Sequence, residues 1–179
     1  EDTFPARAIP KNHAIFQIKP NISELANYCK ALQFTIILHL PNEIATPFHE
    51  SYPFEIGRLM KFRLKAVSYE IDKTLKGYTA FRRNCYLQNE RQLKFFKSYT
   101  KAHCDFECMT NYTLEVCSCV KFSMPREDST PVCNLEEAKC YVDAMENFSN
   151  NTRTTNTDKP CDCLSTCTDI KYDLKVETD

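Results

Sequence analysis

Short apolar segments with strand-like patterns dominate the first half of the chain. Residues 13–19 (HAIFQIK) predict a short strand, and residues 34–40 (FTIILHL) are apolar on both faces, which is typical of a central, covered strand. In residues 60–66 apolar side chains alternate with lysine and arginine. The phase then reverses, so we expect a half-buried strand with a bulge or tight turn near its end. The proline-containing residues 40–53 predict a connection, and residues 13–80 as a whole predict a mostly antiparallel sheet.

A helical pattern replaces the strand pattern in the second half. Apolar residues at helical spacing predict a short helix in residues 87–99, and residues 101–116 (KAHCDFECMTNYTLEV) predict a second helix. Asn134, followed by a glutamate three residues later, predicts the capped start of a third helix that runs to about residue 146. Residues 170–176 alternate again, so we expect a last strand that rejoins the sheet of the first half.

Ten of the eleven cysteines lie between Cys85 and Cys167, which is typical of a disulfide framework. Two cysteines four residues apart on a helix are separated along its axis by about 6 Å, and two cysteines two residues apart on a strand by about 6.6 Å. A helix beside an antiparallel strand would therefore allow two parallel bonds. Ten cysteines allow about 945 pairings, so the sequence alone does not select one. The simplest arrangement is a nested ladder that joins Cys85 to Cys167, Cys104 to Cys163, Cys108 to Cys161, Cys117 to Cys140 and Cys119 to Cys133.

Other uses of the cysteines are less consistent with their spacing. Zinc sites favour C-x2-C pairs and thiol redox sites favour C-x-x-C, whereas this chain has C-x-C and C-x3-C. The remaining cysteine, Cys29, is either buried and free or has a partner outside this sequence. Four glycosylation sequons, which point to the secretory route and an oxidising compartment, begin at Asn21, Asn111, Asn147 and Asn150. The last two lie in a polar run that we expect to be exposed.

Composition and motifs exclude several classes of function. The net charge is −1 without a basic stripe, which argues against nucleic acid as a partner. No apolar run reaches the length of a membrane helix and no signal peptide precedes the chain, so we expect an excised ectodomain or mature fragment. Phosphate loops and hydrolase or metalloprotease motifs are absent and the histidines show no metal-pair spacing, so we predict neither an enzyme nor a cofactor.

Five acidic residues are candidates for sensing a stimulus. A solvated helix face with a polar loop is the simpler interpretation. The functional alternative is a set of carboxylates that share protons when pressed against another acidic surface, because like charges raise each other's pKa. The residues are Glu136, Glu137, Asp143, Glu146 and Asp158.

The cysteine module resembles the thumb of the degenerin and epithelial sodium channel family, most closely its insect pickpocket branch. The resemblance covers roughly residues 25–175. It is carried by Leu38-His39-x-Pro41-x-Glu43, Arg83-x-Cys85, Glu90, Leu93, Phe96, Tyr99, Cys104-x3-Cys108, Cys117-x-Cys119, Met124-Pro125-Arg126, Cys133, Cys140 and Cys161-x-Cys163-Leu164 ending at Cys167. In that family five nested disulfides make a helical thumb that stands on a β-sheet palm beneath a β-ball.

The resemblance implies an α+β fold with an antiparallel palm and β-ball region in residues 1–84, a disulfide-rich helical thumb in residues 85–167 and a strand returning to the palm in residues 168–179. It further implies a subunit of a trimeric, amiloride-sensitive cation channel on the extracellular side of the plasma membrane. Other subunits and an unknown extracellular ligand or protons would be its partners, and the membrane would be reached only through segments absent from this chain. The alternative is a secreted, disulfide-rich binding or inhibitor protein.

Two departures from the family pattern concern the base of the thumb. Ser165 replaces the usual proline of the C-L-P-x-C motif. The chain has no tryptophan, so we expect either that Tyr86 or Phe81 replaces the aromatic residue that acid-sensing relatives place there, or that the coupling at the thumb base differs.

Overall fold

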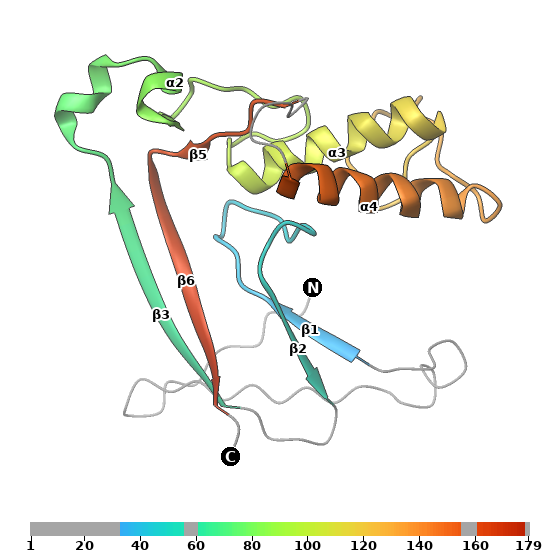
Figure 1. Cartoon of the computed structure of the whole chain (residues 1–179), viewed down its shortest axis with the longest axis horizontal. Coiled ribbons are helices and arrows are strands. Elements are labelled where there is room, and N and C mark those ends of the chain that lie inside the picture. Colours follow the sequence, from blue (N-terminus) through green and yellow to red (C-terminus); the bar gives the residue numbers. More distant parts are fainter. Residues whose placement is uncertain (1–32, 56–60, 155–160, 178–179) are drawn as a thin grey trace.

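The computed structural model describes residues 33–55, 61–154 and 161–177 and has an α+β fold. In Figure 1 two long helices, α3 (Lys101–Cys117) and α4 (Ala138–Thr154), lie side by side above the β1–β2 hairpin, and a long β-ribbon extends away from them. The strands are β1 (Gln33–Ile37), β2 (Ser51–Glu55), β3 (Lys61–Glu70), β4 (Cys85–Tyr86), β5 (Ser165–Thr166) and β6 (Thr168–Glu177). The short helices η1 (Lys73–Gly77) and α2 (Ala80–Arg83) connect β3 to β4.

The predicted return of the last strand is confirmed. Strand β6 pairs with β3 in an antiparallel register that runs without interruption from Lys61 opposite Glu177 to Glu70 opposite Thr168. The predicted bulge near Ala66 is wrong, since Ala66 pairs directly with Tyr172. The physical reason is that this ribbon has no single covered face within the described residues, so the apolar period can change phase without disturbing the ladder.

Strands β1 and β2 form a second antiparallel pair, with Phe34 opposite Phe54 and Thr35 opposite Pro53. Part of the predicted connection is therefore a strand, and Pro53 is tolerated because a two-stranded sheet has an outer edge at which no amide donor is needed. Within the described residues β1 has a strand neighbour on one side only, rather than the central position that its apolar character predicts. The predicted strand in residues 13–19 lies outside the described residues.

The helix predicted in residues 101–116 is confirmed as α3. It begins after Thr100, whose Oγ1 accepts a hydrogen bond from the His103 amide (3.2 Å), and it ends at Ser118, which has a left-handed φ of 59°. Side chains on one face of α3 pack against α4 and the segment between the two helices. The buried cluster is made of Phe106, Cys108, Met109, Val120, Met124 and Phe148.

Helix α4 is preceded by the predicted capping residues but is longer than predicted. The Asn134 side chain accepts hydrogen bonds from the amides of Glu136 (2.9 Å) and Glu137 (3.0 Å), and the Glu137 carboxylate accepts one from the Asn134 amide (2.8 Å). The helix continues to Thr154 because Phe148, only 4% exposed, packs into the cluster against α3. Tertiary packing therefore extends the helix into a run whose polar composition favours a loop.

No helix forms in residues 87–99, where the sequence predicts one. Asn89 has a left-handed φ of 70°, and the amides of Lys94 (2.9 Å) and Phe95 (3.0 Å) donate to the Glu107 carboxylate of α3. Because these amides bond to a side chain on another helix, they are not available for a local helical ladder. Within the described ranges, no helix combines the length and the apolar character that a membrane crossing requires.

Candidate functional site

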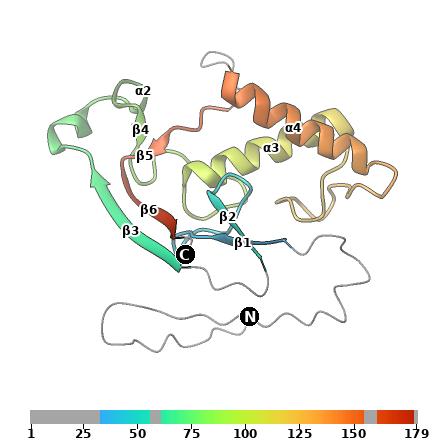
Figure 2. The same cartoon turned by 60° about the horizontal axis from the view of Figure 1, so that its bottom comes forward.

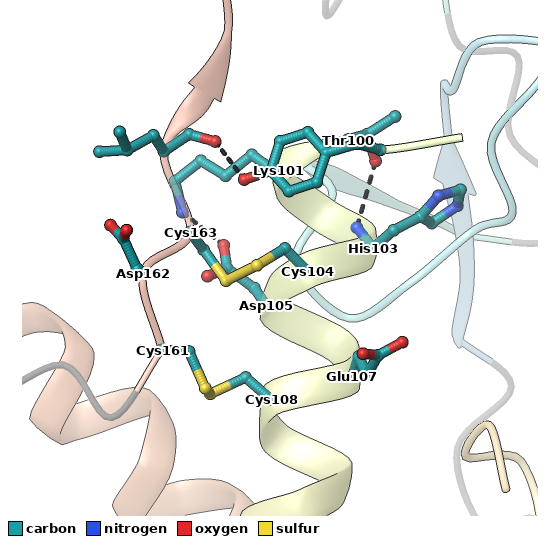
Figure 3. The surroundings of a disulfide bond; sticks show 12 residues. Thr100, Lys101, His103, Cys104, Asp105, Glu107, Cys108, Cys161, Asp162 and Cys163 are labelled. Carbon is teal, nitrogen blue, oxygen red and sulfur yellow. Dashed lines mark hydrogen bonds and ion pairs between the residues drawn. A yellow bond between two sulfur atoms is a disulfide. The ribbon is translucent and has the colours of Figure 1, made fainter. Parts of the chain in front are cut away.

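Two parallel disulfides join α3 to the extended segment that precedes β5. Cys104 bonds to Cys163, with 5.6 Å between their Cα atoms, and Cys108 bonds to Cys161, with 6.0 Å. Figure 3 shows both bonds projecting from one face of the helix toward the neighbouring extended chain. A turn of helix and two residues of extended chain have nearly the same length, so both bonds form without displacing either element.

Three further disulfides extend this ladder at its two ends. Cys85 bonds to Cys167, at the point where the chain enters and leaves the helical module. At the opposite end Cys117 bonds to Cys140, and Cys119 bonds to Cys133. The five bonds are nested one inside another along the sequence, in the order of the ladder considered from sequence.

The Arg83 side chain is the centre of the junction between this module and the β3–β6 ribbon. It is 1% exposed, and its Nε donates to the Cys85 carbonyl (3.1 Å) and lies 3.4 Å from the Cys167 sulfur. Its guanidinium also bonds the Tyr78 carbonyl and the Glu90 carboxylate. The guanidinium lowers the pKa of the Glu90 carboxyl, and the Leu87 amide, which donates to the same carboxylate at 2.7 Å, acts in the same direction. One planar cation thus holds the segments that enter and leave the module.

Two tyrosines complete the junction on the side of α3. The Tyr86 ring is 8% exposed and packs edge-on against Tyr99, with 5.1 Å between centroids. The Tyr86 hydroxyl donates to the Asp162 carboxylate (2.7 Å), and the Tyr99 hydroxyl donates to the Leu164 carbonyl (2.5 Å). Burial raises the pKa of both phenols, so both remain neutral donors at physiological pH.

A cavity of about 640 Å³ lies beside this junction. Its wall is formed by residues 86–89 and 91–93, residues 96–100, residues 166–169, Leu40 and Asn42. The cavity therefore separates the irregular segment before α3 from the first residues of β6.

A match to known proteins identifies the family of this chain. A sequence model described as amiloride-sensitive sodium channel matches residues 13–179. The chain belongs to the amiloride-sensitive sodium channel family. The disulfide-bonded module (residues 85–167) is hereafter called the thumb, and the β3–β6 pair is called the palm ribbon.

The chain is similar to several fly proteins over much of its length. Pickpocket protein 11 of Drosophila melanogaster is 29% identical over 165 residues, which cover 90% of this chain and 30% of the fly protein. Pickpocket protein 28 of the same species is 23% identical over 163 residues (88% of this chain and 26% of that protein). Sodium channel protein Nach of Drosophila ananassae is 27% identical over 95 residues (52% and 18%). The chain spans less than a third of the length of each of these relatives.

The role of the acidic residues in sensing a stimulus stays a prediction. All four of the described ones are exposed: Glu136 and Glu137 precede α4, and Asp143 and Glu146 lie on it. Glu137 bonds the Asn134 amide, which gives it a structural role, whereas Asp158 lies outside the described residues.

The sequons occupy different places. Asn111 is exposed on α3, and Asn147 and Asn150 are exposed on α4, so all three stay predicted glycosylation sites. Asn21 and Cys29 lie outside the described residues. Cys119, Cys133 and Glu137 place ligand-type atoms within 4.8 Å of one another, but both sulfurs are joined in a disulfide and are not thiolate ligands.

Of the two aromatic residues predicted for the base of the thumb, Tyr86 lies in the junction, whereas the Phe81 side chain is 80% exposed. Sequence reasoning assigned no role to Glu107 or to the Arg83 guanidinium. Two signals pointed to the junction: an arginine two residues before a framework cysteine, and the lack of tryptophan, which drew attention to Tyr86. Nothing in the local sequence shows that Glu107 bonds a segment 12–13 residues away.

Proposed function

We propose that this chain belongs to the extracellular part of an amiloride-sensitive sodium channel subunit, where the thumb acts as a rigid arm that passes movement to the palm ribbon. We propose that the chain divides into a palm and β-ball region in residues 1–84, the thumb in residues 85–167 and a returning palm strand in residues 168–179. Assembly with other channel subunits, as a trimer on the extracellular side of the plasma membrane, belongs to the same proposal. Family membership supports the channel assignment.

The observation that carries the relay is the position of the Arg83 guanidinium. Strand β6 starts one residue after Cys167, and Arg83 contacts both Cys85 and Cys167 in addition to the chain that follows η1. Five disulfides suppress local opening of the thumb, so its motion is transmitted as a unit through this junction. Figure 2 shows the ribbon leaving the thumb at β4 and β5, with the β1–β2 hairpin beneath α3.

The relay is tested in the full-length channel with a matched pair of neighbouring arginines. Arg83→Lys keeps a positive charge but cannot make the forked contacts of a guanidinium, whereas Arg82→Lys changes an exposed residue that stacks on the Tyr78 ring. We expect Arg83→Lys to lower the amiloride-blocked current per channel at the surface about tenfold, since losing buried hydrogen bonds costs about 1–3 kcal/mol. Arg82→Lys should leave that current unchanged.

Surface biotinylation normalises the currents and separates gating from folding. If Arg83→Lys does not reach the surface, Tyr99→Phe replaces it, because this change removes only the hydroxyl that bonds the Leu164 carbonyl. Normal currents per surface channel in both variants would overturn the relay. A full-length protein that carries no amiloride-blocked current would instead favour a secreted binding protein.

A further inference from the structure

Three of the four histidines meet where the β1–β2 loop lies against the start of α3. His39 and His49 lie on the loop, with ring centroids 6.1 Å apart, and His103 lies in the first turn of α3. The His103 side chain is buried and stacks on the Phe96 ring at 4.1 Å with an interplanar angle of 7°. Figure 3 shows the His103 ring on the opposite side of α3 from the two disulfides.

The hydrogen bonds of His103 define its tautomer. The Ile44 amide, which can only donate, points at Nε2 at 3.1 Å, so Nε2 carries a lone pair. The Ser98 carbonyl, which can only accept, lies 3.2 Å from Nδ1, so Nδ1 carries the proton. His103 is thus a neutral imidazole that joins the β1–β2 loop to the segment preceding α3. A proton on Nε2 would place two donors face to face.

His49 shows the reverse arrangement inside the loop, because there a backbone amide faces Nδ1. Its Nδ1 lies 3.1 Å from the Thr46 amide, and its Nε2 lies 3.4 Å from the Glu43 carboxylate. A metal ion bound through Nε2 requires a proton on Nδ1, where the Thr46 amide already donates. In each of the two rings one nitrogen therefore already accepts from a backbone amide, which does not suit the pair to hold a metal ion.

We propose that the bond from the Ile44 amide to His103 is an acid-sensitive clasp, which holds the β1–β2 loop on the thumb at neutral pH and releases it when His103 is protonated. This proposal does not depend on the relay through Arg83. The thumb itself stays folded on release, because its disulfides and the contacts between α3 and α4 do not involve the Ile44 bond. Phe48 of the loop also packs edge-on against Phe148 of α4, with 6.0 Å between ring centroids, so the release is confined to the part of the loop around Ile44.

The charged groups around His103 determine the direction of the response. Burial lowers the pKa of His103, which the Ser98 bond and the Glu43 carboxylate oppose, while His49 and His39 act in the same direction as burial. Lys97, before Ser98, is exposed, and Lys101 on α3 is paired with Asp105. Since the native pKa lies below the unfolded value of about 6.5, the stabilisation is complete above about pH 6.5 and is lost as the pH falls through the native pKa.

Amide hydrogen exchange of the oxidised chain, corrected for intrinsic rates, tests the clasp at about pH 7.5 and about pH 5.5. We expect the Ile44 amide to exchange about tenfold faster at the lower pH, whereas the amides of Met109 and Thr113 in the thumb keep their protection. His103→Gln, whose carboxamide oxygen can accept from Ile44 but does not titrate, should remove the pH response. His39→Gln, at an exposed histidine of the same loop, should retain it.

Equal protection of Ile44 at both pH values in the wild-type chain, or the same acid response in His103→Gln, would overturn the proposal. If His103→Gln does not fold, NMR of the wild-type chain decides. The clasp requires the Nδ1–H tautomer of His103 at neutral pH and one shared midpoint for the His103 ring and the Ile44 amide. A Nε2–H tautomer or separate midpoints would contradict it.

Discussion

The thumb and the palm ribbon place their apolar side chains in different surroundings. In the thumb, Met109 and Val120 are 1% and 0% exposed, and five disulfides cross-link the chain. In the ribbon, Leu64 is 52% exposed and Val67 43%, although the two strands pair along their whole length. The thumb is therefore held together by its own disulfides and buried core. The ribbon is held by backbone pairing, and its apolar side chains can be buried further only by other parts of the protein.

The largest expected effect follows from opening the ladder. Cys108→Ser should lower the free energy of unfolding by about 2–5 kcal/mol and prevent secretion, since it removes a cross-link that closes 53 residues and lies in the buried cluster. Denaturant unfolding of refolded protein and the yield of secreted protein measure this. The matched double variant Cys117→Ser/Cys140→Ser opens a separation of 23 residues, so its loop-entropy loss should be smaller by about 0.7 kcal/mol.

Non-reducing peptide mapping checks the pairing on which this prediction depends. Peptides joined through Cys104 and Cys163, and through Cys108 and Cys161, are expected from the nested ladder. A bond between Cys104 and Cys108, or exchanged partners between these two pairs, would contradict it.

A second prediction compares the two regions directly by removing an apolar side chain from each. Met109→Ala should cost about 2–5 kcal/mol, because it leaves a cavity in a cluster that disulfides prevent from collapsing. Leu64→Ala should cost less than about 1 kcal/mol, since half of that side chain is already in water. Thermal or denaturant unfolding of both variants gives the two values. Equal losses would mean that the ribbon has a covered face after all.

The smallest expected effect concerns the junction and depends on alkaline pH. Burial raises the pKa of the Tyr99 phenol in the folded state, whereas in the unfolded chain the phenol titrates near pH ~10. The neutral phenol therefore stabilises the folded state. The stabilisation is complete below about pH 10 and is lost as the pH rises further. In Tyr99→Phe the stability near neutral pH should fall by about 0.5–1.5 kcal/mol, and the loss of stability above pH ~10 should become shallower.

Unfolding measured across the alkaline range, together with phenolate absorbance, checks this prediction. Tyr78→Phe is the control, because Tyr78 is exposed and its ring stacks against Arg82. A Tyr99→Phe profile that is parallel to the wild type across the alkaline range would show that the Tyr99 phenol does not titrate with the junction.

The sequence by itself determined the local features of this protein. Cysteine spacing on a helix and on an extended segment is fixed by the rise per residue, so the ladder was among the arrangements that residues 104–108 and 161–163 favour. The α3 helix and the Asn134 capping residues follow from periodicity and from side chains that bond neighbouring amides. The strand character of β6 follows from the alternating pattern of residues 170–176, and the folded chain pairs that strand with β3.

Tertiary structure alone decided the features in which distant residues compete with local preference. Residues 87–99 are not helical because the amides of Lys94 and Phe95 donate to the Glu107 carboxylate. Helix α4 continues past residue 146 because Phe148 packs into the buried cluster against α3. The contact of His103 with Ile44, 59 residues apart, has no local signature. Hydrogen bonds and burial between residues far apart in the sequence depend on where the folded chain places each partner. The local hydrophobic pattern does not determine that position.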